Sequence, residues 1–98
     1  MREIVISAVN EQGHKALQEH IDSYKKIGFI NQMTMKMMGY SQEVLNQQPL
    51  SLSFKVNNKR MEAEHHFKAI LEEIKTALEL NGANCEHDLT FDFYGGIL

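Results

Sequence analysis

The order of periodic segments in this chain predicts one α+β domain with the element order βαββαβ. Its composition is that of a globular protein with a single core, because 43% of the residues are hydrophobic and 23% are charged. Four segments have the composition or the alternation of β-strands, and two have apolar residues at helical spacing. We expect residues 1–98 to form one domain, since 98 residues are too few for two.

The first β-α unit begins with a run of β-branched residues, Ile4 to Val9, which suits a buried central strand. Asn10 follows and offers its side-chain oxygen as a helix N-cap. Apolar residues then recur at helical spacing up to Tyr24, and Gly28 supplies a stop. This pattern predicts a helix over 11–27.

A period of two predicts the next two strands. The segment from Phe29 to Tyr40 places Met33, Met35 and Met37 on one face, which indicates a strand. The stretch from Ser41 to Pro49 contains the single proline and several amides, and predicts a loop with a helical turn near Glu43 to Leu45. A third strand follows, whose inward residues are Leu50, Leu52, Phe54 and Val56.

The second β-α unit has the longer helix. Asn57 or Asn58 caps it, an apolar stripe continues through it, and Gly82 ends it, so we expect one helix over 59–81. The fourth strand is predicted with Leu89, Phe91 and Phe93 directed inward.

Two such units joined by a hairpin form one antiparallel sheet with both helices on one face, if each crossover is right-handed. This is the ferredoxin-like plait. The arrangement resembles that of amino-acid-sensing regulatory domains, small metal chaperones and dimeric α/β-barrel proteins, and the resemblance concerns architecture alone. Metal chaperones of this kind carry a C-x-x-C loop after the first strand, where this chain reads Val9-Asn10-Glu11-Gln12-Gly13.

The net charge limits the classes of partner that we expect for this protein. Ten Lys and Arg residues against thirteen Asp and Glu residues give a net charge of -3, which predicts neither a nucleic-acid partner nor an anionic membrane partner.

Cys85 is the single cysteine, and the chain opens on a strand-like run, so we expect a cytoplasmic protein. Nucleotide, zinc-hydrolase and acyl-transfer motifs are absent from the sequence, and we predict no cofactor.

The open face of the sheet is the predicted functional surface. On it we expect Lys36, Met38, Tyr40, Lys55, Asp88, Asp92 and Tyr94. Apolar and charged side chains mix there, as in many protein contacts, whereas the exposed aromatics of an RNA-binding plait are missing from the central strands. We therefore favour a non-enzymatic, self-associating domain that binds a ligand or a protein and forms a homo-oligomer through the sheet face or an edge strand.

Two alternatives stay open. A small enzyme could use the open face or the cavity between sheet and helices, with Asp92, Lys55 and Tyr94 as its candidate residues. A soft-metal carrier could use His14, Cys85 and His87, provided that Cys85 and His87 leave the same face of the fourth strand. The methionine run could also bind Cu(I), although core or interface packing is the favoured interpretation. His20 lies at the margin of the first helix's apolar stripe, and the sequence indicates no acidic partner for it.

Overall fold

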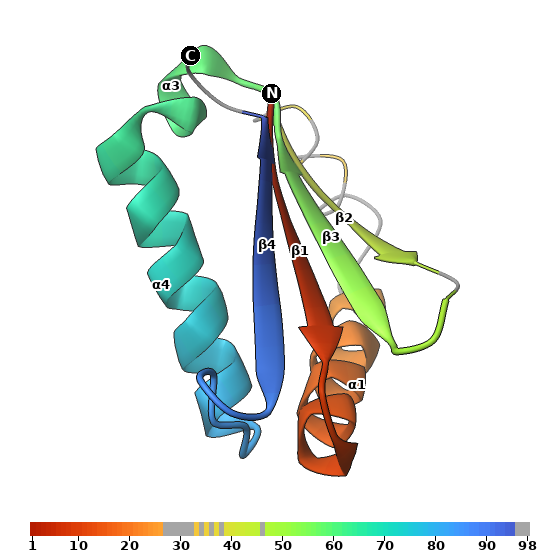
Figure 1. Ribbon diagram of the computed structural model, residues 1–98. Helices are drawn as coiled ribbons and strands as arrows, with labels where there is room; N and C mark the ends of the chain where they lie inside the picture. The colour runs from red at the N-terminus through yellow and green to blue at the C-terminus, as the bar shows by residue number, and fades with distance from the viewer. Residues whose placement is uncertain (27–32, 34, 36, 38, 46, 96–98) are drawn as a thin grey trace.

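The computed structural model describes residues 1–26, 33, 35, 37, 39–45 and 47–95. Its labelled elements are the strand β1 (Arg2–Ala8), the helix α1 (Glu11–Lys25), the strands β2 (Tyr40–Leu45) and β3 (Ser51–Val56), the helices α3 (Lys59–Glu62) and α4 (Glu64–Leu80), and the strand β4 (Leu89–Gly95) (Figure 1).

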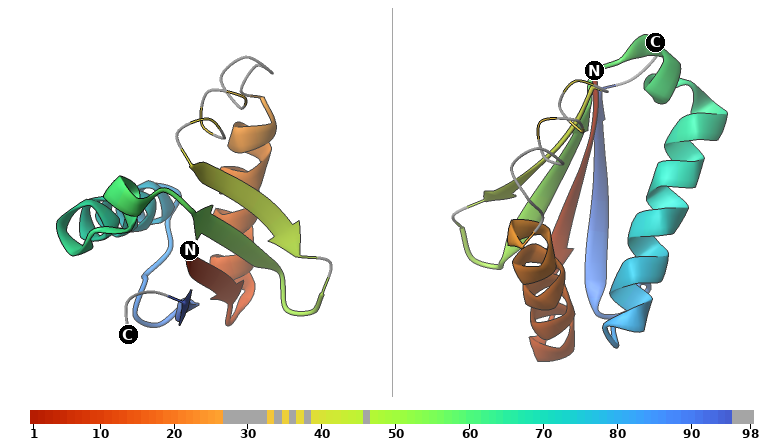
Figure 2. Two further views of the ribbon diagram at one scale, coloured as in Figure 1. Left: turned by 90° about the horizontal axis from the view of Figure 1, so that it is seen from above. Right: turned by 180° about the vertical axis from the view of Figure 1, so that it is seen from behind.

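The four strands form one antiparallel sheet in the order β2-β3-β1-β4. This is the strand order of the ferredoxin-like plait, so the predicted fold class is confirmed. β1 is central, as its β-branched run predicted, with Ile4 opposite Phe54 on one side and opposite Phe93 on the other. Seen from behind, the strands follow one another from β2 to β4, and α1 lies in front of the sheet near the lower ends of β1 and β3 (Figure 2).

One face of the sheet and the two long helices share a single core. Alternate residues of β1 are buried, and they meet the apolar stripes of α1 and α4 on the same face of the sheet. The core comprises Ile4, Ile6, Ala16, Leu17, Ile21, Leu52, Phe54, Val56, Phe67, Ile74, Leu78, Ala83 and Leu89. The opposite face has no helix against it in the described part of the chain.

The start of α1, the end of α4 and the start of β4 meet at one end of the plait (Figure 1). Oδ1 of Asn10 accepts the Gly13 N–H at 2.9 Å, which confirms the predicted N-cap. Nε2 of Gln12 donates to the Gly82 carbonyl at 2.7 Å, and Gly82 follows α4 with φ of 100°. The helix start is thereby fixed to the turn that ends α4.

The prediction for the second strand was wrong. Met33, Met35 and Met37 are helical, and β2 occupies Tyr40–Leu45, which was predicted to be a loop with a helical turn. Methionine is unbranched and favours helices, so its alternation with polar residues was a poor strand signal. Tyr40–Leu45 becomes a strand because every residue in it pairs with β3.

The single long helix predicted over 59–81 was also wrong, because the chain breaks it at Ala63, whose ψ of 141° is not helical. The break leaves the Glu62 carbonyl free to accept from Nη1 of Arg2 at 3.2 Å. The same Arg2 atom pairs with Glu64 at 3.0 Å, and its guanidinium lies 3.6 Å from the centre of the Phe67 ring. The start of β1 thus holds the two helical segments at their junction.

Candidate functional site

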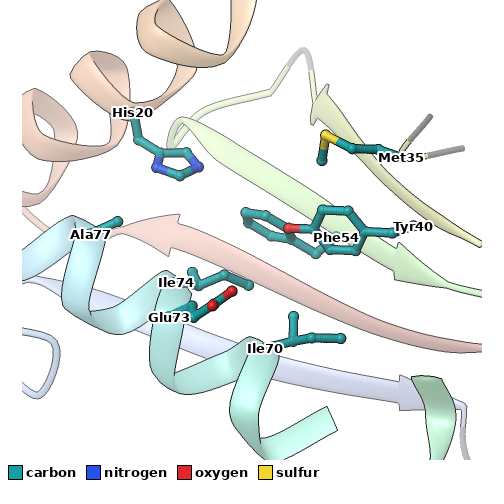
Figure 3. Close-up of a pocket in the computed structure, with 8 residues that line it drawn as sticks. All are labelled: His20, Met35, Tyr40, Phe54, Ile70, Glu73, Ile74 and Ala77. Atoms are coloured by element: carbon teal, nitrogen blue, oxygen red, sulfur yellow. The ribbon is translucent and has the colours of Figure 1, made fainter. Parts of the chain in front are cut away.

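A cavity of about 330 Å³ opens between the helix face of the sheet and the two long helices. Its lining comes from α1, from Met35, from β2 and β3, and from one face of α4 (Figure 3). The residues that line it are His20, Met35, Tyr40, Phe54, Ile70, Glu73, Ile74 and Ala77. The four α4 residues follow the spacing i, i+3, i+4, i+7, which places them along one side of a helix.

Aromatic rings form one wall of the cavity. Phe54 is fully buried on β3, and the His20 and Tyr40 rings each lie 5.9 Å from it, centroid to centroid, in tilted arrangements. Tyr40 faces the cavity because the β2 register sets it opposite the inward Val56. Its predicted place on the open face was wrong, since that placement assumed a strand ending at Tyr40 rather than beginning there.

Two buried polar atoms, one on the cavity wall and one beside it, make no hydrogen bond of good geometry to a described residue. They are Nε2 of His20 and Oε1 of Gln42. The Gln42 side chain lies within hydrogen-bonding reach of both the His20 ring and the Tyr40 hydroxyl, although its geometry towards Nε2 of His20 is poor. A buried polar atom without a partner costs roughly 1–3 kcal/mol, so this pair of atoms marks a place where another polar group would stabilise the fold.

Burial shifts the pKa values of two groups on the cavity wall, His20 and Tyr40, towards their neutral forms. Burial lowers the pKa of His20 below 6.5, with the Gln42 side chain acting in the opposite direction. Burial also raises the pKa of Tyr40 well above 10.0, and the nearby charge of Glu73 acts in the same sense. At neutral pH the cavity therefore holds an uncharged imidazole and an uncharged phenol.

The lowered pKa of His20 predicts a pH dependence of stability. The unfolded chain binds the His20 proton more readily than the folded chain, so the free energy of unfolding falls as the pH drops below 6.5 and levels off below the folded-state pKa. Urea unfolding at a series of pH values measures this slope. We expect His20→Gln to reduce it and His14→Gln, at an exposed site, to preserve it. Equal slopes in the two variants would contradict the assignment.

Three of the residues predicted for the open face lie on it, Lys55 on β3 and Asp92 and Tyr94 on β4. Lys55 and Tyr94 each lie opposite Glu3, on different sides of it, and Asp92 lies opposite Val5. Lys55 forms an exposed ion pair with Glu43 at 3.5 Å, whereas Asp92 and Tyr94 are exposed on β4. Lys36 and Met38 lie outside the described residues.

Two serines of β3 that lie on the open face are fully buried. The Ser53 hydroxyl donates to the Glu3 carboxylate, and the Ser51 hydroxyl lies 2.8 Å from that of Ser7. Nε2 of Gln47 donates to Ser51 at 3.0 Å. The centre of this face is therefore closed by hydrogen bonds within the sheet.

Asp88 precedes β4 rather than lying on the open face, so its predicted position was wrong. Its carboxylate accepts the Asn84 N–H at 2.8 Å and a side-chain N–H of Asn10 at 2.9 Å. Both hydrogen bonds, the Asn84 one first, lower the pKa of Asp88. Asp88 therefore joins the N-cap residue of α1 to the turn between α4 and β4, and its role is structural.

The predicted metal ligands are not assembled. Cys85 and His87 lie in the turn before β4, not on the strand, and His14 is exposed on α1. Burial raises the pKa of the Cys85 thiol, whose Sγ lies 3.6 Å from the Lys75 carbonyl, and soft metals bind the thiolate. Within the described ranges, no three His, Cys, Asp or Glu residues form a group that could hold a metal ion.

His20 and Glu73 both line this cavity, and the sequence did not indicate that they share one site. They lie 53 positions apart on different helices. The one signal in the sequence was the position of His20 at the edge of an apolar stripe.

Among the described residues, no helix has the length and hydropathy needed to cross a membrane. No protein-family model, curated protein or solved structure matches the chain.

Proposed function

We propose that this chain is a non-enzymatic binding domain whose cavity holds a small, neutral, mainly apolar molecule with one hydrogen-bonding group. The observation that carries the proposal is the pair of buried atoms Nε2 of His20 and Oε1 of Gln42, neither of which makes a hydrogen bond of good geometry to a described residue, beside a cavity whose described lining is largely apolar. Specific ligand sites combine these two properties, namely apolar walls and a few convergent polar atoms.

The size of the cavity limits the ligand. Its volume of about 330 Å³ lies near the lower end of the roughly 300–1,000 Å³ typical of small-molecule sites. A single substituted aromatic ring matches such a volume and can pack on Phe54 and Ile74.

The polar atoms limit its chemistry. Oε1 of Gln42 is an acceptor and requires a donor, and Nε2 of His20 can donate or accept according to its tautomer. A hydroxyl group satisfies both atoms, because it donates one hydrogen bond and accepts another. An anionic ligand is disfavoured, because the described lining residues include the carboxylate of Glu73 and no cation at neutral pH.

An enzyme working in the same cavity is the second candidate. It is favoured by His20 and Glu73, since a neutral imidazole can take a proton and a carboxylate can support it. Asp92, Lys55 and Tyr94 do not line this cavity, so they are not candidate catalytic residues of an enzyme that works in it. If the wild type converts a bound ligand to a product and the His20→Gln variant does not, the protein is an enzyme rather than a binding domain.

The test uses p-cresol and toluene, which share a ring and differ in one hydroxyl group. We expect titration calorimetry or NMR titration to detect p-cresol binding, tighter than toluene by about 2-fold to 13-fold, the equivalent of one hydrogen bond of roughly 0.5–1.5 kcal/mol. Ala77→Leu fills the cavity and should weaken p-cresol binding by about 10-fold or more. Ala69→Leu makes the same change on the exposed side of α4 and should leave binding unchanged.

Each outcome has a distinct meaning. Failure of the wild type to bind either probe would overturn the proposed function. Equal affinity for the two probes would retain an apolar site and reject the role of His20 and Gln42. Equal weakening by Ala77→Leu and Ala69→Leu would place the binding outside the cavity.

A further inference from the structure

The strand β4 is an edge of the sheet with few of the features that protect natural edges. In the described part of the chain its backbone pairs with β1 alone, so the outer N–H and C=O groups of this strand have no ladder partner. Proteins commonly protect such edges with lysine, proline or a bulge. The seven residues of β4, Leu-Thr-Phe-Asp-Phe-Tyr-Gly, include neither lysine nor proline, and Asp92 is their single charge.

Exposed aromatic residues lie on the same edge. Phe93 is 52% exposed on the helix side of β4, and Tyr94 is 53% exposed on the open side. The other edge strand, β2, exposes one large apolar side chain, Val44, at 36%. Apolar exposure combined with unpaired backbone is a feature of strands that pair with another chain.

We propose that β4 pairs antiparallel with β4 of a second copy, with Phe93 opposite Phe93. The two four-stranded sheets then become continuous, and both edges are covered by one two-fold contact. The partner is a second copy of the chain, because the side chains of β4 complement one another when two copies pair in one antiparallel register.

Symmetry restricts the possible registers. Both copies keep their helices on the same side of the joined sheet only if helix-facing residues of one β4 lie opposite helix-facing residues of the other. In an antiparallel pair of identical strands, this requires one residue to lie opposite the same residue of the other copy. Three registers pair most of β4, centred on Phe91, Asp92 or Phe93. The register at Asp92 sets two carboxylates opposite each other, which is destabilising.

The register at Phe93 satisfies the most groups. It brings the two half-exposed Phe93 rings together, beside the Phe67 ring that each already contacts at 6.5 Å. It also sets each Asp92 opposite a Tyr94 hydroxyl, which can donate to the carboxylate. The register at Phe91 leaves Tyr94 without a paired residue, so the Phe93 register is the one that covers both exposed aromatic residues.

Single cysteines distinguish the three registers. In a Cys85→Ser background, Phe91→Cys, Asp92→Cys and Phe93→Cys each place a thiol opposite itself in one register. Directly opposed residues have Cα atoms about 4.5–5.5 Å apart, within the roughly 4.4–6.8 Å that a disulfide spans. After mild oxidation we expect the Phe93→Cys variant to form dimers fastest on a non-reducing gel. Faster cross-linking of either other variant, or equal slow cross-linking of all three, would overturn the proposal.

A measurement without cysteines keeps the test independent of oxidation. Sedimentation equilibrium of the concentrated wild type should give twice the chain mass of 11.3 kDa. Phe93→Lys adds a charge to this edge and should give a monomer, while Val44→Lys makes a similar change on β2 and should stay dimeric. Circular dichroism of both variants confirms folding. A monomeric wild type, or a dimer lost only in Val44→Lys, would overturn the proposal. β4 does not line the cavity, so this result is separate from ligand binding.

Discussion

Phe54→Ala is expected to lower the free energy of unfolding by about 3–5 kcal/mol. Phe54 has no exposed surface and contacts the His20 and Tyr40 rings, so the truncation removes buried apolar area and leaves a void. A domain of this size has a total stability of roughly 5–15 kcal/mol, so the loss is a large fraction of it. Urea unfolding followed by circular dichroism measures the change.

Phe93→Ala is the matched control, because it makes the same chemical change at a half-exposed position of the sheet. We expect its cost to be about 1 kcal/mol when measured in dilute solution, where self-association does not contribute. Similar losses in the two variants would show that Phe54 is not the centre of the core.

Gly13→Ala is expected to lower the free energy of unfolding by a net of about 1–2 kcal/mol. A Cβ atom at Gly13 would lie 1.9 Å from the carbonyl oxygen of Asp88 and 3.3 Å from the Leu89 side chain. The obstructing Asp88 carbonyl belongs to the backbone and cannot rotate away, so α1 must shift away from the start of β4. Overpacking of this kind costs about 1–3 kcal/mol. Alanine recovers about 1 kcal/mol through its higher helix propensity, which is too little to offset the clash.

Lys15→Ala is the control for Gly13→Ala, because it introduces alanine at an exposed position of the same helix. Its effect should stay within about 0.5 kcal/mol. Thermal and urea unfolding both report the comparison. A stabilised Gly13→Ala protein would contradict the close contact between α1 and the Asp88 carbonyl.

The two proposals concern different parts of the molecule. The cavity is bounded by the helices and by residues of β2 and β3, whereas the proposed dimer contact is the outer edge of β4. Variants at Ala77 and at Phe93 can therefore be combined, and their effects on ligand affinity and on mass should be independent.

Local chemistry was sufficient to predict the elements whose signals lie within a few residues of each other. Asn10 fixed the start of α1 and Gly82 followed the end of α4, because capping and left-handed glycine depend on neighbouring backbone groups. The inward face of β3 followed from its alternation, with Leu52, Phe54 and Val56 all buried. Together these elements were enough to predict the plait.

The β2 segment shows where local signals were insufficient. The alternation from Phe29 to Tyr40 favoured a strand by period, while its unbranched methionines are also good helix formers. Tyr40–Leu45 has no strong alternation of its own and becomes a strand by pairing with β3. Because side chains on a strand alternate between faces, this shift also reversed the face on which Tyr40 was expected.

By itself, the sequence determined the fold class, the central position of β1, the face of β3 that meets the helices and the N-cap of α1. Only the tertiary structure decided the candidate site. His20 and Glu73 line the cavity and Gln42 lies beside His20; the three residues belong to three different elements, which come together because β2 pairs with β3 while α1 and α4 pack on the same face. Capping and periodicity act between neighbours in the chain, whereas a cavity depends on register and packing between distant segments, which no local pattern encodes.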